Sequence, residues 1–294
     1  MVYLILNIVF ASSFTLFIKW VQTRQREDML TVGMINYVVG AALTFPEFYA
    51  AGVSGPDATA MLTGGSMGAC YFIAFFFVTY AIRKVGASAA TVVGSLSILM
   101  PIGFGVLIWS EKPNIFQAFG IVLAVLSLTL VSGNRQDRPK SAFPDAESPR
   151  GWVTPAILAT FFLLAGFSRL AQETFKHESH TNHRPTFLFT AFVVAAIPAA
   201  IILIARRRMP TRLEFAFGCG MGVSNILQTH FILKSLHHFP GYIVFLVSSA
   251  GGVMLTVLVA TCVLGERLHR KTCWGIGIAV MALILLNWLP GESL

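Results

Sequence analysis

Polar side chains inside a long apolar run are the residues of this sequence best suited to bind a polar molecule. The run 213–235 holds the most of them: Ser224, Asn225, Gln228, Thr229 and His230. In a helix, Asn225 shares a face with Gly218 and Gly222, and small residues let neighbouring helices approach closely. The amides of Asn225 and Gln228 either bond a neighbouring helix or line the path of a polar solute. We predict that both line such a path.

Three hydroxyl-bearing residues are weaker candidates for the same path. Tyr71 lies on a comparable face of the run 59–82, and Ser95 and Ser249 lie inside two further apolar runs. A serine within a helix commonly bonds its own backbone carbonyls, which is the competing interpretation for both serines.

Two basic residues, Lys19 and Arg169, occupy matching places near the ends of the first and sixth apolar runs. Long basic side chains reach readily from a span end to the membrane interface, so snorkelling is one interpretation. The other is a pair of cationic gates that attract an anionic or zwitterionic substrate. Arg169 lies roughly a turn deeper than a span end, which favours the second interpretation for Arg169 and the first for Lys19. Both are retained as binding candidates.

Two glutamates, Glu111 and Glu266, each lie just before an apolar run. A carboxylate at a helix start meets the positive end of the helix dipole and accepts hydrogen bonds from free N–H groups. We therefore predict a structural role for both, which is to fix tight turns between the fourth and fifth spans of each half.

The remaining carboxylates lie outside the interior of the long apolar runs. No Asp or Glu lies deep in a predicted span, and Glu47 and Glu173 lie near span ends. Charge inside a membrane is costly, so ion-coupled carriers commonly keep such a carboxylate for function. Its absence favours a facilitator or exchanger.

Metal-binding and catalytic patterns are weak. The segment 173–183 carries His177, His180 and His183, but without the His-Glu-x-x-His spacing, so a solvated loop is favoured over a zinc site. The four cysteines form no close-spaced motif. We expect no metal, no cofactor and no catalytic residue.

The elements that position these residues follow from composition. Of 294 residues, 55% are hydrophobic and 12% are charged, whereas a soluble domain carries about 25% charged residues. This composition argues against a soluble enzyme, a nucleic-acid binder and a disordered chain. It indicates a polytopic membrane protein, because each spanning helix needs roughly 20 apolar residues.

Ten apolar runs follow one another along the chain. They lack the alternation of a β-barrel strand, so helices are predicted. The runs are 2–21, 30–51, 59–82, 86–109, 115–132, 152–174, 186–205, 213–235, 240–263 and 272–289.

The two halves of the sequence resemble each other. A shift of 155 residues places Glu111 on Glu266, and a shift of 154 places Gly64 on Gly218. A five-helix repeat, 1–132, is thus predicted to precede a polar linker, 133–151, and a second repeat, 152–294. An odd number of spans in each repeat makes the second repeat inverted in the membrane.

Basic residues support this inversion. The net charge is +8, and the connections after odd-numbered runs hold 16 Lys and Arg against 4 on the other face. The positive-inside rule places the richer connections in the cytoplasm and both termini outside. The basic residues thus report orientation before any anionic partner, and no nucleic-acid partner is expected.

Short motifs then point to a family. The second half reads Leu264-Gly265-Glu266-Arg267-Leu268 and then Trp274-Gly275, while the first reads Trp109-Ser110-Glu111-Lys112-Pro113 and then Gln117 and Gly120. With Pro101 and Lys19, this doubled arrangement resembles the EamA-like transporters of the drug/metabolite transporter superfamily. The chain departs from the family pattern in three ways. Ser110 replaces the glycine of the first turn, no proline in the second half matches Pro101, and the charges place both termini outside.

This resemblance implies an all-α integral membrane protein with ten transmembrane helices in two inverted five-helix repeats. It also implies a central cavity lined by spans one to four and six to nine, with spans five and ten bracing it. The implied function is alternating-access transport or export of small polar metabolites, such as amino acids or related solutes. The expected partners are the solute and membrane lipids, and the expected location is a bacterial inner (plasma) membrane.

Two alternatives remain open at this point. An integral-membrane enzyme acting on a lipid-like substrate would need clustered Asp, Glu, His or Cys, for which the histidine segment is the one candidate. A channel would also suit a repeated architecture. Saturation and counter-transport would distinguish a carrier from a channel.

Overall fold

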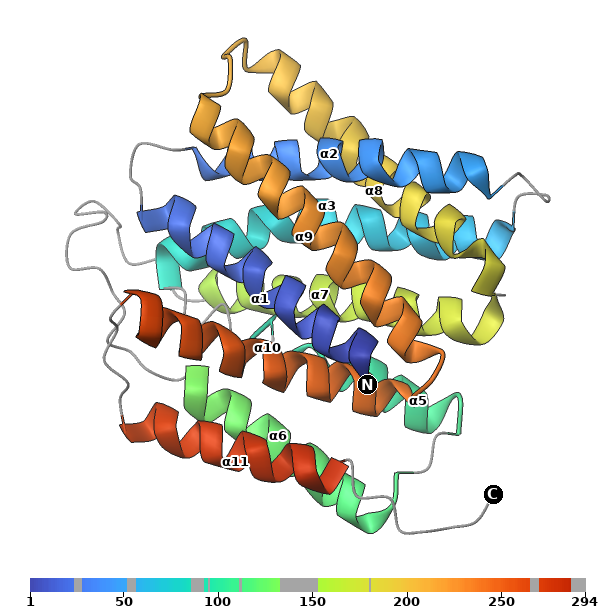
Figure 1. The fold of residues 1–294 in the computed structure, drawn as a ribbon, viewed down its shortest axis with the longest axis vertical. Helices are drawn as coiled ribbons and strands as arrows, with labels where there is room; N and C mark the ends of the chain where they lie inside the picture. Colours follow the sequence, from blue (N-terminus) through green and yellow to red (C-terminus); the bar gives the residue numbers. More distant parts are fainter. Residues whose placement is uncertain are drawn as a thin grey trace. The chain divides into compact units, whose positions relative to one another are not determined.

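A computed structural model of the chain describes residues 1–23, 28–51, 57–85, 93–94, 96–110, 113–132, 153–179, 181–264 and 270–286. This described part is helical and contains no strand (Figure 1). Its elements are α1 (Val2–Thr23), α2 (Met29–Ala50), α3 (Ala58–Val85), α5 (Leu99–Leu107), α6 (Ile115–Ser132), α7 (Val153–Glu178), the 3-10 turn η2 (Thr181–His183), α8 (Arg184–Ala205), α9 (Arg212–Leu236), α10 (Gly241–Leu264) and α11 (Arg270–Leu286).

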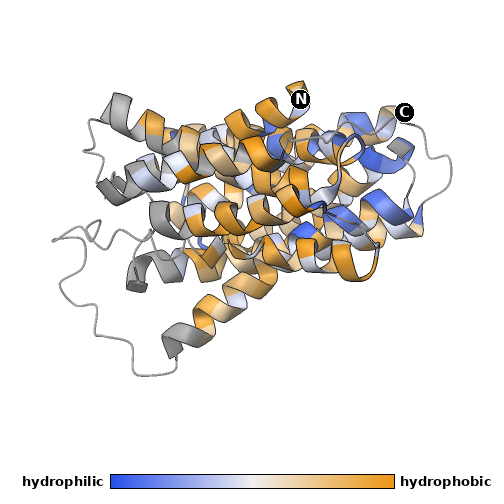
Figure 2. Cartoon of the chain, turned by 90° about the horizontal axis from the view of Figure 1, so that it is seen from below, coloured by the Kyte–Doolittle hydropathy of each residue, from blue (hydrophilic) through white to orange (hydrophobic). Residues whose placement is uncertain are grey.

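The all-helical prediction is confirmed for the described residues, and a helix overlaps every predicted run. Figure 2 shows hydrophobic residues along most of the length of these helices. Four segments are long and apolar enough to cross a membrane: Met29–Ala50, Ala58–Tyr80, Ala156–Glu178 and Arg184–Ala205. The other spans stay predictions.

The run 86–109 departs from the single long helix expected for it. In its described part, Ser97 and Ile98 form a turn, and α5 begins only at Leu99. Proline has no N–H, so Pro101 cannot donate to the carbonyl four residues earlier. The N–H of Met100 bonds the Ser97 carbonyl instead, at 3.2 Å. Hydropathy alone predicts an unbroken helix here, and Pro101 was considered only for its part in the family pattern, so this interruption was not predicted.

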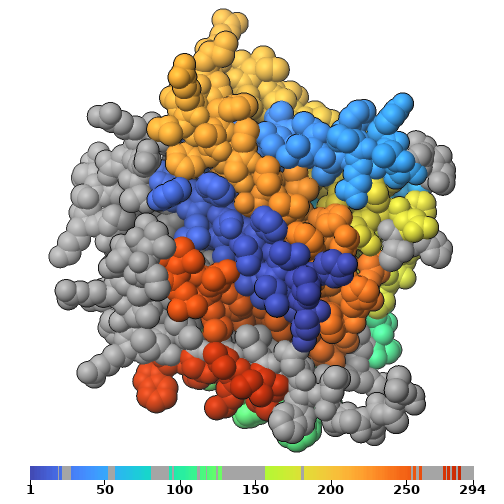
Figure 3. Space-filling model, viewed as in Figure 1, coloured from blue at the N-terminus to red at the C-terminus, as the bar shows by residue number. Residues whose placement is uncertain are grey.

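The helices form two compact units, and the first comprises Met1–Phe72 and Ser168–Phe239. In this unit, α2 packs against α8 and α9, and α1 lies along α9 (Figures 1 and 3). Glycines permit close approach: a Cβ added to Gly222 would lie 3.0 Å from the Asn36 carbonyl oxygen. The first unit therefore positions polar residues of α2 and α9 against each other.

Apolar side chains also cover the outside of the first unit. On α8, Phe187 and Ala191 are buried, while Ile197, Ile201 and Ile204 are 57%, 62% and 77% exposed. A row of exposed isoleucines on one helix suits contact with lipid better than contact with water.

The second unit comprises Ile73–Phe167 and Pro240–Leu294. Here α6 and α11 lie side by side, and α10 contacts α5, α6 and α11 (Figure 1). Each unit thus combines segments from both predicted halves of the sequence. The division into repeats 1–132 and 152–294 stays a prediction, and the linker 133–151 lies outside the described residues.

Candidate functional site

The polar residues of α9 meet those of α2 and α1 inside the first unit. The Asn225 Nδ2 donates to Asn36 Oδ1 at 3.3 Å, and Gln228 Nε2 donates to Asn225 Oδ1 at 2.9 Å. From α1, Asn7 Nδ2 donates to the main-chain oxygen of Gln228 at 2.7 Å. We call Asn7, Asn36, Asn225 and Gln228 the interior amide cluster. It carries no ionised side chain, and three of its members are almost fully buried.

A second group of polar contacts surrounds Tyr71 of α3. The Gln172 Nε2 of α7 donates to Tyr71 Oη at 3.3 Å, and Tyr37 Oη donates to the Tyr71 carbonyl at 2.8 Å. The Tyr71 hydroxyl also shares a hydrogen bond with Thr229 and lies near enough to Arg169 for the guanidinium charge to act on it. Three helices distant in sequence therefore meet at one phenol group.

Thr229 joins the two groups. Its hydroxyl donates to the Asn225 carbonyl at 2.8 Å and contacts the Tyr71 hydroxyl. The structure thus brings together four predicted site residues: Asn225, Gln228, Tyr71 and Arg169. Asn225 uses its amide to bond a neighbouring helix, one of the two roles left open by the sequence.

The other predicted residues lie in the second unit or have side chains outside the described part of the chain. Lys19 lies in α1, where its backbone is helical, and Ser249 lies half-buried in α10 of the second unit. Ser95, Glu111 and Glu266 lie outside the described residues. The turn role of both glutamates stays a prediction.

Gln172 is the residue that sequence reasoning missed. It lies in the sixth apolar run, and a shift of 150 residues places Gln22 on it. Its side chain is buried between α7 and α3, and its Nε2 also donates to Met67 Sδ at 3.4 Å. A polar residue in an apolar run at a repeat-matched position was the available signal.

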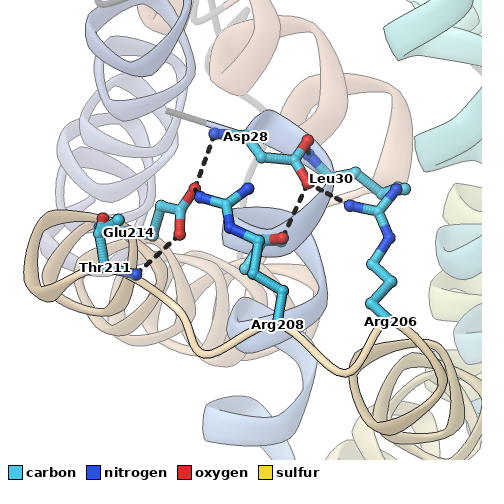
Figure 4. A network of polar contacts seen from close by, with 7 residues as sticks. Asp28, Leu30, Arg206, Arg208, Thr211 and Glu214 are labelled. Carbon is cyan, nitrogen blue, oxygen red and sulfur yellow. Dashed lines mark hydrogen bonds and ion pairs between the residues drawn. The ribbon is translucent and has the colours of Figure 1, made fainter. Parts of the chain in front are cut away.

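A charged network joins the start of α2 to the loop between α8 and α9 (Figure 4). Glu214 accepts from the main-chain N–H of Asp28 at 2.9 Å, and Arg208 lies 2.8 Å from the same Glu214 oxygen. Arg206 pairs with the Asp28 carboxylate. With Thr211, these residues form what we call the helix-end charge cluster.

Two helix caps organise this cluster. Thr211 and Glu214 bond reciprocally as a capping box at the start of α9, which satisfies N–H groups that have no partner within the helix. Asp28 caps α2 by accepting from the Leu30 N–H and the Thr31 hydroxyl. Burial raises the pKa of Asp28, but the bonds from Thr31 and Leu30 and the Arg206 charge together hold that pKa below its usual value. The arginines predicted as an orientation signal therefore also join two helix ends.

The carboxylate near the end of α7 is buried in the fold. Glu173 was expected near a span end; it lies five residues before the end of α7, with 1% of its surface exposed. Lys176 Nζ lies 3.1 Å from its Oε1, and His177 Nε2 lies 3.4 Å away. A cation thus compensates the buried charge, as a buried carboxylate requires. His177 contacts a carboxylate here, and within the described residues no group of three or more His, Cys, Asp or Glu is placed to hold a metal ion.

The class of protein follows from these features. The described residues are all in helices, turns and short connections, and four of these helices are long and apolar enough to span a bilayer. With the exposed isoleucines of α8, this indicates an integral membrane protein. The family model for the EamA-like transporter family matches residues 1–133. This part of the chain is therefore similar to the EamA-like transporters, a family of the drug/metabolite transporter superfamily.

The chain is also similar in fold to a solved structure titled "Crystal structure of protein". The two share 14% sequence identity with a TM-score of 0.71, and the similarity covers 97% of this chain and 96% of the other. At this identity the similarity concerns the fold alone. No curated protein matches the sequence.

Proposed function

We propose that the protein is a secondary transporter or exporter of small polar metabolites, such as amino acids or related solutes, and works by alternating access. The observation that supports this most strongly is the interior amide cluster with its link to Tyr71. Neutral amides and hydroxyls from α1, α2, α3, α7 and α9 meet among the buried residues of the first unit. Such groups can exchange bonds with a polar solute without burying an unpaired ion.

The proposed architecture is ten spans in two inverted repeats, and a pair of matching contacts supports it. On α3, Gly64 and Gly68 lie against the carbonyl oxygens of Phe187 and Ala191 of α8. On α9, Gly218 and Gly222 lie against the carbonyl oxygens of Val32 and Asn36 of α2.

The two contacts are related by nearly constant shifts. The glycines differ by 154 residues in both pairs, and the carbonyls differ by 155 in both pairs. Equivalent helices thus use equivalent residues in exchanged roles, as expected for two repeats related by a pseudo-twofold axis.

Facilitated diffusion or exchange is the proposed mode of transport. The buried Glu173 is already paired with Lys176, so it is not a free proton carrier in this arrangement. The proposed setting is a bacterial inner (plasma) membrane, with the basic connections cytoplasmic and both termini outside. Small-molecule solutes and membrane lipids are the proposed partners.

A solute screen followed by a flux assay tests the proposal. Purified full-length protein is screened for thermal stabilisation by a metabolite panel, and each stabilising solute is then assayed in proteoliposomes with the same solute inside. We expect saturable uptake that internal solute accelerates and that an imposed proton gradient leaves unchanged. Ion currents far above carrier rates would instead indicate a channel, and metal-dependent turnover of a lipid would indicate an enzyme.

A further inference from the structure

The Gln172 side chain has one polar atom without a partner. It is 3% exposed, and its Nε2 bonds Tyr71 and Met67, but its Oε1 has no hydrogen-bond partner among the described residues. A buried acceptor without a hydrogen bond destabilises the folded protein. A ligand that brings an N–H or O–H donor to Gln172 Oε1 would therefore gain binding free energy from this hydrogen bond.

The orientation of the amide does not remove this feature. A glutamine side-chain amide can be turned by 180°, which exchanges its oxygen and its nitrogen. The hydrogen-bonding neighbours decide which atom lies at which place. Met67 Sδ is an acceptor and faces Nε2 at 3.4 Å, which favours the nitrogen at this place. The unpartnered atom is therefore the carbonyl oxygen, which needs an N–H or O–H donor.

A cation lies on the same face of α7. Arg169 and Gln172 are three residues apart in one helix, so their side chains are neighbours on its surface. Arg169 is in electrostatic contact with the Tyr71 hydroxyl that Gln172 bonds. A solute cation near these groups would be repelled by the guanidinium, whereas an anion would be attracted.

We propose that Gln172 and Arg169 form one recognition site for a small solute in which an N–H or O–H donor lies next to an anionic group. This chemistry is shared by α-amino acids and α-hydroxy acids. The donor bonds Gln172 Oε1, and the carboxylate faces Arg169. The inference rests on the proposed transport function and narrows its substrate class.

Matched ligand sets test the site on the purified full-length protein. Each set has one side chain and four members: amino acid, hydroxy acid, unsubstituted acid and amine. Suitable sets are alanine, lactate, propionate and ethylamine; leucine, 2-hydroxyisocaproate, isocaproate and isoamylamine; and phenylalanine, phenyllactate, phenylpropionate and phenethylamine. In at least one set, the amino or hydroxy acid should bind about tenfold more tightly than the unsubstituted acid, the value of one hydrogen bond. The amine should bind most weakly of the four. Comparison of the amino acid with the hydroxy acid in each set shows which of the two solute classes the site prefers.

Two variants assign the effect to the named residues. Gln172→Met keeps the length of the side chain and removes the acceptor, so the preference for the substituted over the unsubstituted acid should disappear. Arg169→Gln should abolish the preference for acids over the amine. The control is Thr44→Val on α2, a buried position whose hydroxyl bonds the Gly40 carbonyl of its own helix at 2.9 Å, and it should retain both preferences.

The outcomes separate this inference from the proposed function. Retained preferences in Gln172→Met and Arg169→Gln, equal binding of the amine, or no binding in any set would overturn the recognition site. Binding with both preferences but without uptake in proteoliposomes would overturn transport while supporting the site. Uptake of a bound solute that has the same affinity for both variants as for the wild type would support transport and overturn the recognition site.

Discussion

Two polar clusters of the first unit solve different physical problems. The helix-end charge cluster contains ionised groups, and it lies where α2 and α9 begin. The interior amide cluster is neutral, and it lies along the length of α1, α2 and α9. Ionised groups are costly away from water unless they are paired, whereas amides can bond one another or a solute. We therefore propose that the charged cluster contributes stability and that the neutral cluster contacts the solute.

The largest expected effect is on stability, at Glu214. This side chain is fully buried and accepts from the main chain of Thr211 and Asp28 and from Arg208. Glu214→Ala leaves those donors without their acceptor and should lower the free energy of unfolding by roughly 3 kcal/mol. Thermal unfolding of the purified protein measures the loss.

Glu178→Ala is the control for this variant, because Glu178 is exposed at the end of α7 and should change stability by less than about 0.5 kcal/mol. Flux per folded molecule should be retained in Glu214→Ala. Normal stability with abolished flux would reverse the assignment of the two clusters.

A smaller loss is expected from a glycine that holds α3 against α8. A Cβ at Gly68 would collide with the Ala191 carbonyl oxygen, while a Cβ at Gly65 would meet only side-chain methyl groups, the nearer at 3.7 Å. Gly68→Ala should therefore destabilise the protein by about 2 kcal/mol through overpacking. Gly65→Ala is the matched control on the same helix and should be neutral. Equal melting temperatures for the two variants would show that α3 does not pack this closely.

The smallest effect concerns the pH dependence of Asp28. Its pKa in the folded protein lies below the usual 3.8, so the ionised carboxylate stabilises the fold above the unfolded pKa. That contribution is lost as the pH falls below about 4 and through the folded pKa. Asp28→Asn should be less stable than the wild type by under about 1 kcal/mol at neutral pH. Unfolding measured from pH 7 to pH 3 should show this gap closing, and a gap that widens in acid would refute the assignment.

Much of the fold was predictable because it follows from apolar run length. Spans such as 30–51 and 186–205 end within a residue or two of the helices Met29–Ala50 and Arg184–Ala205. The resemblance to EamA-like transporters is confirmed over residues 1–133. The turn at Ser97–Ile98 was missed because hydropathy is insensitive to a single missing N–H at Pro101.

The site was predictable only in part. Asn225 and Gln228 were identified by their polarity in an apolar run, but their partners Asn36 and Asn7 come from helices that the sequence does not place beside α9. Glu214 could have been found, since Thr211 with Glu214 is a capping-box pattern at the start of a run. The burial of Glu173 depends on tertiary packing, which run length does not report.

Solute flux through amide variants tests the central claim most directly. Asn225→Ala and Gln228→Ala are reconstituted in proteoliposomes, with uptake of a stabilising solute expressed per folded molecule and Thr44→Val as the control. The account predicts at least about a tenfold loss of flux, the value of one hydrogen bond, in variants that still fold. Wild-type flux in both variants would show that the interior amide cluster only packs helices together.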